Sequence, residues 1–360
     1  MPERRPATAN GNQPMTRDPS AGRAAFVATG EKPAPVPPAP AARAPAARQR
    51  HLLSILDLSP GEVLYLCRRA VRIKHASADP QTLRGKAVGV YFRRASTRTR
   101  AAFAVGAGRL DATVATFGPH DLQTNTGETV EDTARTLAGY LDVLVMRTSG
   151  SLAEMETFAG WPGMSVVNAL NQEEHPTQAL ADLATLLEHF GRLEGLSLLY
   201  CGEGNRTAAA LALAMGRIPG ARLTLATPAG YGLDPEKLAA ARALAAAHGA
   251  AVEQVHDVDA VPGAVDVVYT SRWREMGDAK ADPVWRSRFA PFRVTRALLE
   301  RVSGPGTVFM HDLPAVRGED VDDEVLDGPR SLAWVQAQHK MRSAMAVMEW
   351  CGAGVVHDDP

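Results

Sequence analysis

The chain has 360 residues, 45% of them hydrophobic, and its formal net charge of −1 gives no argument for a nucleic-acid or membrane-surface partner. This length allows two core-bearing domains, and because polar residues interrupt every apolar stretch well before the roughly eighteen residues of a membrane span, we expect a soluble protein. The three cysteines, Cys67, Cys201 and Cys351, lack CxxC spacing, so they predict neither a disulfide framework nor a zinc site and fit the reducing cytoplasm.

Residues 1–50 consist mainly of Ala, Pro, Gly and Arg and contain almost no large apolar side chains. Such a segment cannot bury enough surface to offset the entropy lost on ordering, so we expect a disordered tail. Its seven Arg and one Lys against three acidic residues give it a charge of +5, which leaves −6 on the rest of the chain. An Arg-rich, acid-poor leader is also typical of organelle transit peptides, but these prolines oppose an amphipathic helix.

The folded part is expected to begin near His51. Its first helix opens at a capping box formed by Ser59 and Glu62, with Pro60 at the first helical position. Strand-like and helix-like segments then alternate. In this first unit we predict strands at 86–92, 112–117, 141–146 and 164–170, and helices at 97–108, 129–138, 151–160 and after His175.

A second unit starts near Leu193. We predict its strands at 196–201, 221–226, 265–270 and 306–311, a helix at 234–249, and a closing helix at 334–350 that is long enough to cross back onto the first unit. This alternation implies parallel βαβ units, in which ligands bind at the carboxyl ends of the strands. Ser96, Arg147 and His175 each follow such an end.

The segment Ser96–Arg100 reads STRTR and joins a predicted strand to a predicted helix. A hydroxyl at the helix cap, the free backbone N–H groups of the first turn and two arginines, Arg98 and Arg100, are what a phosphate dianion needs at a helix N-terminus. The segment therefore predicts a phosphate cradle. A solvated, basic helix start is the alternative interpretation of these five residues.

Three motifs in order, STRTR at 96–100, HPTQALADL at 175–183 and HDLP at 311–314, resemble the aspartate/ornithine carbamoyltransferase family over about residues 51–352. The resemblance implies an α/β fold with two doubly wound parallel-sheet domains joined by interdomain helices. Residues 51–190 would bind carbamoyl phosphate, residues 191–335 would bind the amino acid, and a C-terminal helix at 336–360 would pack on the first domain. It also implies a homotrimer with sites at subunit interfaces. We expect a cytoplasmic protein that uses no cofactor, and no residue cluster with metal-ligand spacing appears in the sequence.

Site residues follow from the resemblance one by one. Gln123 matches a glutamine whose loop reaches a neighbouring subunit's site, and Arg147 matches an arginine that contacts both the phosphate and the carbamoyl oxygen. His175 and Gln178 match the pair that grips the carbamoyl group, and Lys340 stands where ornithine enzymes usually have an arginine, which keeps the charge but loses the bidentate fork. The remaining residues of the implied carbamoyl phosphate site are Ser96, Thr97, Arg98, Thr99, Asp312 and Leu313.

The chemistry supports the same residues independently. Attack of a neutral amine on the carbamoyl carbon places negative charge on the carbonyl oxygen and then on the departing phosphate. Donors aimed at that oxygen, here Thr99, Arg147 and His175, act as an oxyanion hole, and Gln178 completes the expected catalytic set. His175 is therefore expected to donate a hydrogen bond rather than to act as the general base, and phosphate or solvent takes the proton.

The acceptor half departs from both branches of the family. Arginines at positions 206 and 272 resemble aspartate enzymes, whereas Met276 resembles the Ser-Met-Gly segment of ornithine enzymes. Two arginines predict a carboxylate on the acceptor, and Asp312 and Glu275 suit a second cationic group. We therefore expect an ornithine-like or short diamino acid such as 2,3-diaminopropionate, with a simple aspartate-type acceptor as the alternative. The expected acceptor residues are Asn205, Arg206, Ser271, Arg272, Glu275, Met276 and Asp312.

Two other classes of function are considered. The turn GEGNRT at 202–207 follows a predicted strand, as in nucleotide-binding oxidoreductases, but it lacks the full GxGxxG fingerprint and an acidic ribose ligand. A non-catalytic paralogue would show an altered acceptor site, but it would not need every carbamoyl phosphate contact. Four tryptophans at apolar spacing predict packing rather than a site; they are Trp273, Trp285, Trp334 and Trp350.

Overall fold

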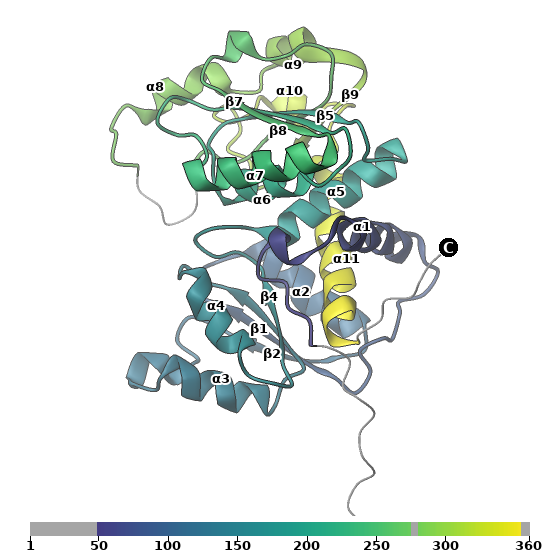
Figure 1. The fold of residues 1–360 in the computed structure, drawn as a ribbon, viewed down its shortest axis with the longest axis vertical. Helices are drawn as coiled ribbons and strands as arrows, with labels where there is room; N and C mark the ends of the chain where they lie inside the picture. The colour runs from purple at the N-terminus through teal and green to yellow at the C-terminus, as the bar shows by residue number, and fades with distance from the viewer. Residues whose placement is uncertain (1–48, 275–279, 354–360) are drawn as a thin grey trace, which may run out of the picture. The chain divides into compact units, whose positions relative to one another are not determined.

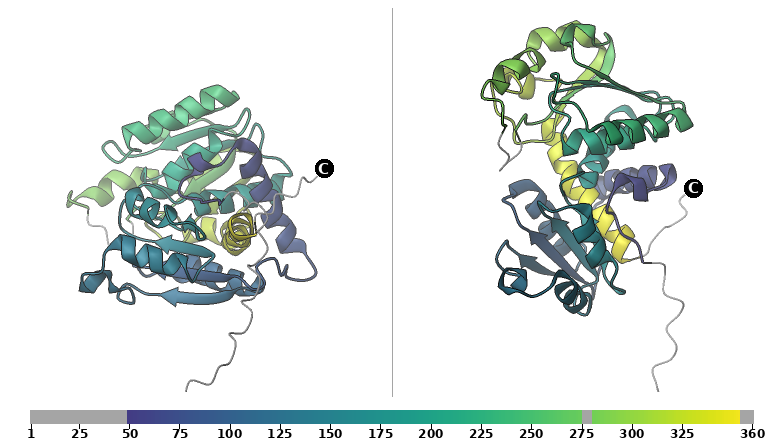
Figure 2. Two further views of the ribbon diagram at one scale, coloured as in Figure 1. Left: turned by 60° about the horizontal axis from the view of Figure 1, so that its bottom comes forward. Right: turned by 60° about the vertical axis from the view of Figure 1, so that its left-hand side comes forward.

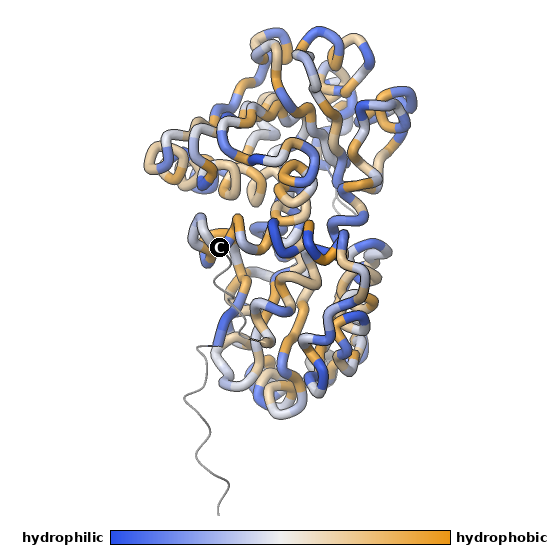
Figure 3. The backbone as a smooth tube through the Cα atoms, turned by 90° about the vertical axis from the view of Figure 1, so that its right-hand side faces the viewer, coloured by the Kyte–Doolittle hydropathy of each residue, from blue (hydrophilic) through white to orange (hydrophobic). Residues whose placement is uncertain are grey.

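The computed structural model describes residues 49–274 and 280–353, without the side chains of residues 124 and 125. Nearly all of the predicted disordered tail therefore lies outside the described residues, as do Glu275, Met276 and the last seven residues. By its internal contacts the chain divides into Met1–Pro45 and Ala46–Pro360, and every described residue belongs to the second unit. None of the helices within the described ranges is both long and apolar enough to cross a membrane, and polar residues interrupt the apolar stretches throughout (Figure 3).

The first sheet has four parallel strands in the order β2-β1-β3-β4 (Figure 1). They are β1 (Ala87–Phe92), β2 (Thr113–Phe117), β3 (Val143–Arg147) and β4 (Ser165–Asn168). Around them lie α1 (Pro60–His75), α2 (Thr97–Arg109), α3 (Val130–Ala138) and α4 (Leu152–Ala159), with short 3₁₀ turns at Ile55–Asp57 and Gln123–Thr126. The predicted capping box of α1 is present. The Ser59 side chain accepts a hydrogen bond from the Glu62 N–H, and the Glu62 side chain accepts one from the Ser59 N–H.

The second sheet has five parallel strands in the order β7-β6-β5-β8-β9. They are β5 (Ser197–Cys201), β6 (Arg222–Ala226), β7 (Ala251–Val255), β8 (Val265–Thr270) and β9 (Ser303–His311). Alternate residues of the central strands enter two different cores. Leu198 and Tyr200 pack with α6 (Arg206–Met215) and α7 (Pro235–His248), whereas Leu199 packs on the other face with α9 (Arg296–Val302) and α10 (Asp323–Leu326).

Two long helices join the sheets. The helix α5 (Pro176–Phe190) packs against α6 on one side and α1 on the other, and α11 (Ala333–Gly352) packs against α5, α1 and α2 (Figure 2). The start of α11 is tied to β9 through the Leu332 N–H, which donates to the Phe309 carbonyl, and its end reaches β4, where the Ser165 hydroxyl donates to the Cys351 carbonyl. One continuous hydrophobic core therefore includes residues of both sheets, and the α/β class with two doubly wound parallel sheets is confirmed.

Three features differ from the sequence-based expectations. The strand β7 was not predicted, because AVEQV is a short edge strand with polar residues and follows an Ala-rich helix. The helices α8 (Trp285–Phe289) and α9 were also missed, since five and seven residues carry little periodicity. The prediction that four tryptophans pack inside the protein is wrong for Trp334, whose surface is 51% exposed. It is confirmed for Trp273, Trp285 and Trp350, which are buried.

Candidate active site

One cavity lies where the carboxyl ends of both sheets meet. The strand order reverses between β1 and β3 in the first sheet and between β5 and β8 in the second, and such switch points open a crevice at the carboxyl ends of the strands. The loops that follow these four strands all contribute. The described lining residues are Arg94, Ala95, Ser96, Arg98, Thr99, Arg147, Thr148, Ser149, Leu170, His175, Asn205, Arg206, Thr207, Ser271, Arg272, Asp312, Leu313, Pro314 and Lys340.

The N-terminus of α2 faces this cavity. Ser96 occupies the N-cap position, yet its side chain makes no capping hydrogen bond within the described structure, so the first-turn N–H groups stay open to a ligand. Burial lowers the pKa of Arg98, which lines the cavity, and the Asp312 carboxylate opposes that shift. Arg100 points elsewhere, because its guanidinium donates to the Phe117 carbonyl. The interpretation that both arginines serve the cradle is therefore wrong for Arg100.

Arg147, His175 and Thr99 all line the cavity. Arg147 ends β3, and its Nη1 donates to the Thr99 hydroxyl at 3.4 Å. His175 is only 3% exposed, and its Nδ1 has no hydrogen-bond partner among the described residues. Burial holds the pKa of His175 well below its usual value, and the nearby cations Lys340, Arg147 and Arg206 lower it further. The imidazole is therefore neutral near pH 7 and keeps one ring N–H that can donate a hydrogen bond to a carbonyl oxygen.

Gln178 lies beneath the cavity and is absent from its described lining. Its Oε1 accepts a hydrogen bond from the Lys340 ammonium, and its Nε2 donates to the Asp182 carboxylate at 2.8 Å. Lys340 itself lines the cavity. Burial lowers the pKa of Lys340 to about 8, with Arg147 acting in the same direction and Asp312 opposing it. Lys340 thus connects the cavity to the amide of Gln178.

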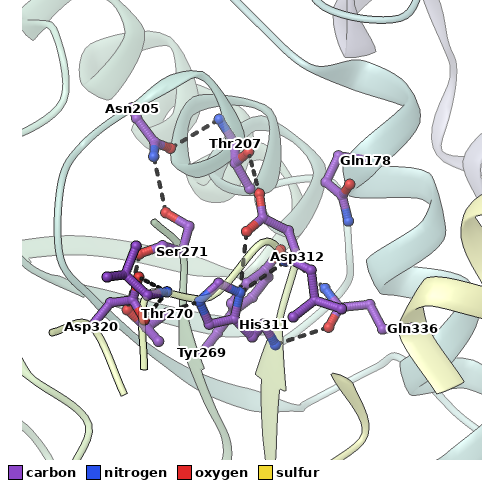
Figure 4. A network of polar contacts seen from close by, with 12 residues as sticks. Gln178, Asn205, Thr207, Tyr269, Thr270, Ser271, His311, Asp312, Asp320 and Gln336 are labelled. Carbon is purple, nitrogen blue, oxygen red and sulfur yellow. Dashed lines mark hydrogen bonds and ion pairs between the residues drawn. The ribbon is translucent and has the colours of Figure 1, made fainter. Parts of the chain in front are cut away.

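The sequence analysis missed Asp182, the centre of this buried network. Besides Gln178, its carboxylate accepts hydrogen bonds from the Gln336 amide at 2.7 Å and the Tyr269 hydroxyl at 2.9 Å. Burial raises the pKa of Asp182 to about 7. The network joins α5, β8 and α11, and part of it is drawn in Figure 4. Asp182 follows Gln178 by four residues on one helix, so the i,i+4 spacing was the signal that could have found it.

The turn after β9 carries a histidine and an acid. His311 is fully buried, and its Nδ1 accepts a hydrogen bond from the Leu313 N–H, so the ring proton lies on Nε2, 3.5 Å from the Asp320 carboxylate. Asp312 lies beside it and accepts a hydrogen bond from the Thr207 hydroxyl at 3.0 Å (Figure 4). Asp312 is the one carboxylate among the described residues that line the cavity.

The other acceptor-site candidates divide into satisfied polar groups and arginines. Asn205 caps α6 through its Oδ1, and its Nδ2 donates to the Ser271 hydroxyl at 2.9 Å, which lies 2.5 Å from the Tyr200 hydroxyl. The Arg206 Nε donates to a backbone carbonyl at 3.2 Å, while the Arg272 Nε is buried without a partner in the part of the chain that the structure describes. Both arginines line the cavity.

Two further predicted residues lie away from the cavity. Thr97 is exposed and absent from the described lining. Gln123 is exposed on the 3₁₀ turn Gln123–Thr126, where its Oε1 accepts a hydrogen bond from the Thr126 hydroxyl at 2.7 Å. The expected acceptor residues Glu275 and Met276 lie outside the described residues.

The glycine-rich turn after β5 has a packing explanation. A Cβ atom at Gly204 would lie 2.2 Å from the backbone of Gly232 and Leu233, so only glycine allows the two loops to meet. Gly204, the second glycine of this turn, is therefore explained by packing between two loops of the protein, and it does not indicate a dinucleotide-binding site. Nor does any group of three or more His, Cys, Asp or Glu side chains in the described ranges form a metal-binding cluster.

Comparisons with known proteins agree over both sheets. A family model described as the carbamoyl-P binding domain of aspartate/ornithine carbamoyltransferase matches residues 50–188, and one described as its Asp/Orn binding domain matches residues 194–351. An ornithine carbamoyltransferase of Symbiobacterium thermophilum is 40% identical over 304 residues, which cover 83% of this chain and 96% of that protein.

Solved structures give the same result. The ornithine carbamoyltransferase from Pyrococcus furiosus has a TM-score of 0.79 and 34% identity, covering 85% of this chain and 98% of that one. The one from Gloeobacter violaceus has a TM-score of 0.74 and 35% identity, covering 85% of this chain and 99% of that one.

Proposed function

Because the chain belongs to the aspartate/ornithine carbamoyltransferase family and is a carbamoyltransferase, we propose that its acceptor is an amino acid with a second cationic group. The carbamoyl group of carbamoyl phosphate passes to an amino group of ornithine or of a shorter diamino acid such as 2,3-diaminopropionate, and phosphate leaves. The observation that carries this proposal is the charge arrangement of the cavity, in which two arginines and Asp312 share the half formed by the second sheet.

In the proposed mechanism, the open N-terminus of α2 and the Arg98 guanidinium hold the phosphate. Arg147, Thr99 and neutral His175 donate to the carbamoyl oxygen, whose negative charge grows as the amine attacks. In comparable acyl transfers, each such donor stabilises the transition state by about 3 kcal/mol. Ser96 lies at the same end of the cavity, and Thr97, whose side chain is exposed, contributes only the backbone N–H of the first helical turn. Leu313 follows Asp312 at the opposite wall.

Gln178 acts first on Lys340 and then on the carbamoyl group. Its amide is held between Lys340 and Asp182, so it orients the Lys340 ammonium toward the cavity and contacts the carbamoyl amide once Lys340 turns to the phosphate. Lys340 supplies a point charge rather than a bidentate fork.

On the acceptor side, Arg206 and Arg272 bind the carboxylate, and Asp312 binds the second ammonium group. Asn205 and Ser271 support this wall through the hydrogen bond between them. The acceptor roles of Glu275 and Met276, which lie outside the described residues, stay predictions from the sequence. An aspartate-type acceptor is disfavoured because its second carboxylate would approach Asp312, and like charges in a dry site repel strongly. The relatives named as ornithine carbamoyltransferases support an acceptor with two amino groups.

Domain roles and assembly follow from the same proposal. Residues 51–190 bind carbamoyl phosphate, residues 191–335 bind the acceptor, and residues 336–360 return to the first domain. The exposure of Gln123, away from its own cavity, supports a contact with a neighbouring subunit's site in a cytoplasmic homotrimer. Mixing Gln123→Ala and Arg98→Ala proteins tests this assembly, because shared sites regain activity in mixed trimers and unshared sites do not.

The acceptor is tested by measuring phosphate release from carbamoyl phosphate with ornithine, aspartate, putrescine and 2,3-diaminopropionate, together with mass detection of the product. We expect one diamino acid to give the highest kcat/KM and a product heavier by one carbamoyl group. A strong preference for putrescine, which has no carboxylate, would contradict the roles of the two arginines. A preference for aspartate would contradict the role of Asp312.

A further inference from the structure

Lys280 lies in a box of aromatic rings beside the proposed acceptor wall. Its ammonium is 5.0 Å from the ring centre of Tyr231, 5.4 Å from that of Trp285 and 5.0 Å from that of Phe289. Only 7% of the Lys280 side chain is exposed. A desolvated ammonium at these distances is attracted by the negative faces of the rings, provided that an anion also balances its charge.

That anion is Glu203. The Lys280 ammonium lies 2.5 Å from the Glu203 carboxylate, whose side chain is 22% exposed. Glu203 belongs to the turn between β5 and α6, two residues before Asn205 and three before Arg206. The same turn is bound to the box a second time, because the Gly204 N–H donates to the Tyr231 carbonyl at 2.8 Å.

The box also holds the segment that carries the second acceptor arginine. Trp273, the residue after Arg272, is buried and packs on Phe289 with their ring centres 5.2 Å apart. Its ring lies so close to Gly202 that a Cβ atom there would be 3.1 Å from the indole. Each of the two arginine-bearing segments, around Arg206 and around Arg272, is therefore fixed to the same ring cluster.

We propose that Lys280 is a positioning residue that sets the relative placement of Arg206 and Arg272. Its ammonium joins the ring cluster, on which Trp273 holds the neighbouring Arg272, to Glu203 in the 203–206 turn, so the two guanidinium groups are presented to one acceptor carboxylate. This role rests on the proposed function of the two arginines. Lys280 itself touches neither substrate, and it acts only on the acceptor side of the cavity.

The test compares Lys280→Met, which keeps the aliphatic volume in the box but removes the charge, with the wild-type protein. We expect the KM for the preferred acceptor to rise about tenfold or more, because a small misplacement of binding groups is costly. The KM for carbamoyl phosphate is expected to stay within about twofold, since its proposed ligands belong to other segments. Lys280→Arg, which keeps a cation over the rings, is expected to restore most of the acceptor affinity.

Arg286→Met is the matched control. Arg286 also stacks on Trp285, 4.5 Å from its ring centre, but pairs with Glu319 rather than with the 203–206 turn. Its loss is expected to leave both KM values unchanged. If Lys280→Met fails to fold, as judged by circular dichroism, Glu203→Gln removes the same ion pair with little change in shape and is expected to show the same selective rise.

Equal rises in both KM values, a fall in kcat alone, or the same effect in Arg286→Met would overturn the inference. Its failure is separable from failure of the proposed function. If the wild-type protein prefers putrescine, the diamino-acid proposal fails, and the positioning role fails with it because no carboxylate remains for the two arginines. If the wild-type protein prefers a diamino acid and Lys280→Met leaves the KM for that acceptor unchanged, only the positioning role is overturned.

Discussion

The two halves of the cavity are built differently, although both use the carboxyl ends of parallel strands. In the first half, the proposed ligands of carbamoyl phosphate come mainly from two helix starts, Ser96–Thr99 and His175, and from the end of β3 at Arg147. Thr99 and His175 are almost completely buried. This half presents hydroxyl, imidazole and guanidinium donors, and its described lining contains no carboxylate.

In the second half, the lining comes from three separate loops, and it mixes charges. Arg206 and Arg272 are cationic, and Asp312 is anionic. Asn205 donates a hydrogen bond to Ser271. A donor-only surface suits one anion of fixed shape, whereas a mixed surface discriminates among acceptors by attraction and repulsion. With the proposed roles, the reaction class depends on the first half, while the choice of acceptor depends on the second.

Arg147→Met should give the largest effect, because it removes a charged donor from the first half. We expect kcat/KM for carbamoyl phosphate to fall about 10³-fold, the scale for the loss of one oxyanion donor. Steady-state kinetics with every acceptor in the panel measures this, and the fall should be the same for all of them. Arg100→Met is the control, since Arg100 contacts the Phe117 carbonyl outside the cavity. A loss that depends on the acceptor would contradict the division between the halves.

Two changes in the second half should act mainly on the acceptor. Arg272→Met is expected to raise the KM for the preferred amino acid about 100-fold, because a buried charge-assisted contact is lost. Asp312→Asn is expected to raise it about tenfold for a diamino acid and to lower it for aspartate, since the repulsion disappears. The KM for carbamoyl phosphate serves as the internal control for Arg272→Met only, because the Asp312 carboxylate also acts on Arg98 and Lys340. A fall in affinity for aspartate in Asp312→Asn would contradict the proposed role of this carboxylate.

Much of the fold and of the first half was predictable from the sequence, for physical reasons. Buried parallel strands are continuous apolar runs, so β1, β3 and β8 were evident, whereas the polar edge strand β7 was not. The first half is encoded in short contiguous motifs, and their residues reach the cavity because strand ends meet at one edge. Contacts across loops were not predictable: Asp182 needs Tyr269 and Gln336 around it, and the box around Lys280 is assembled from distant aromatic residues.

Lys340 lines the cavity where its two halves meet, and its charge depends on pH. Burial lowers the pKa of Lys340 to about 8, so its ammonium is lost as the pH rises through that value. We expect the KM for carbamoyl phosphate, measured with saturating acceptor, to rise severalfold between pH 7 and 9, roughly one unit on either side of this pKa. Lys340→Arg should remove the rise, because a guanidinium stays protonated across this range. Parallel profiles for the two proteins would contradict this assignment.

Glu174→Gln should give the smallest effect, since Glu174 acts on stability and on the loop before His175 rather than on a substrate. Its buried carboxylate accepts hydrogen bonds from the Ser54 hydroxyl at 2.5 Å and the Ile55 N–H at 2.8 Å. Burial raises the pKa of Glu174 above its usual 4.5, and the two hydrogen bonds oppose the shift. The folded protein therefore holds this proton more tightly than the unfolded chain, so stability from this group is full below pH 4.5 and is lost as the pH rises through the folded-state pKa.

Glutamine keeps the size of this side chain and one acceptor oxygen without the charge. The difference in melting temperature between Glu174→Gln and wild type should therefore become more favourable to the variant from pH 5 to pH 8, with a change of about 1 kcal/mol or less in unfolding free energy. The exposed Glu156→Gln is the control, and its difference should be the same at both pH values. Because His175 keeps its place on α5, kcat should stay within about twofold; a large loss of kcat would mean that the buried carboxylate controls the first half of the cavity directly.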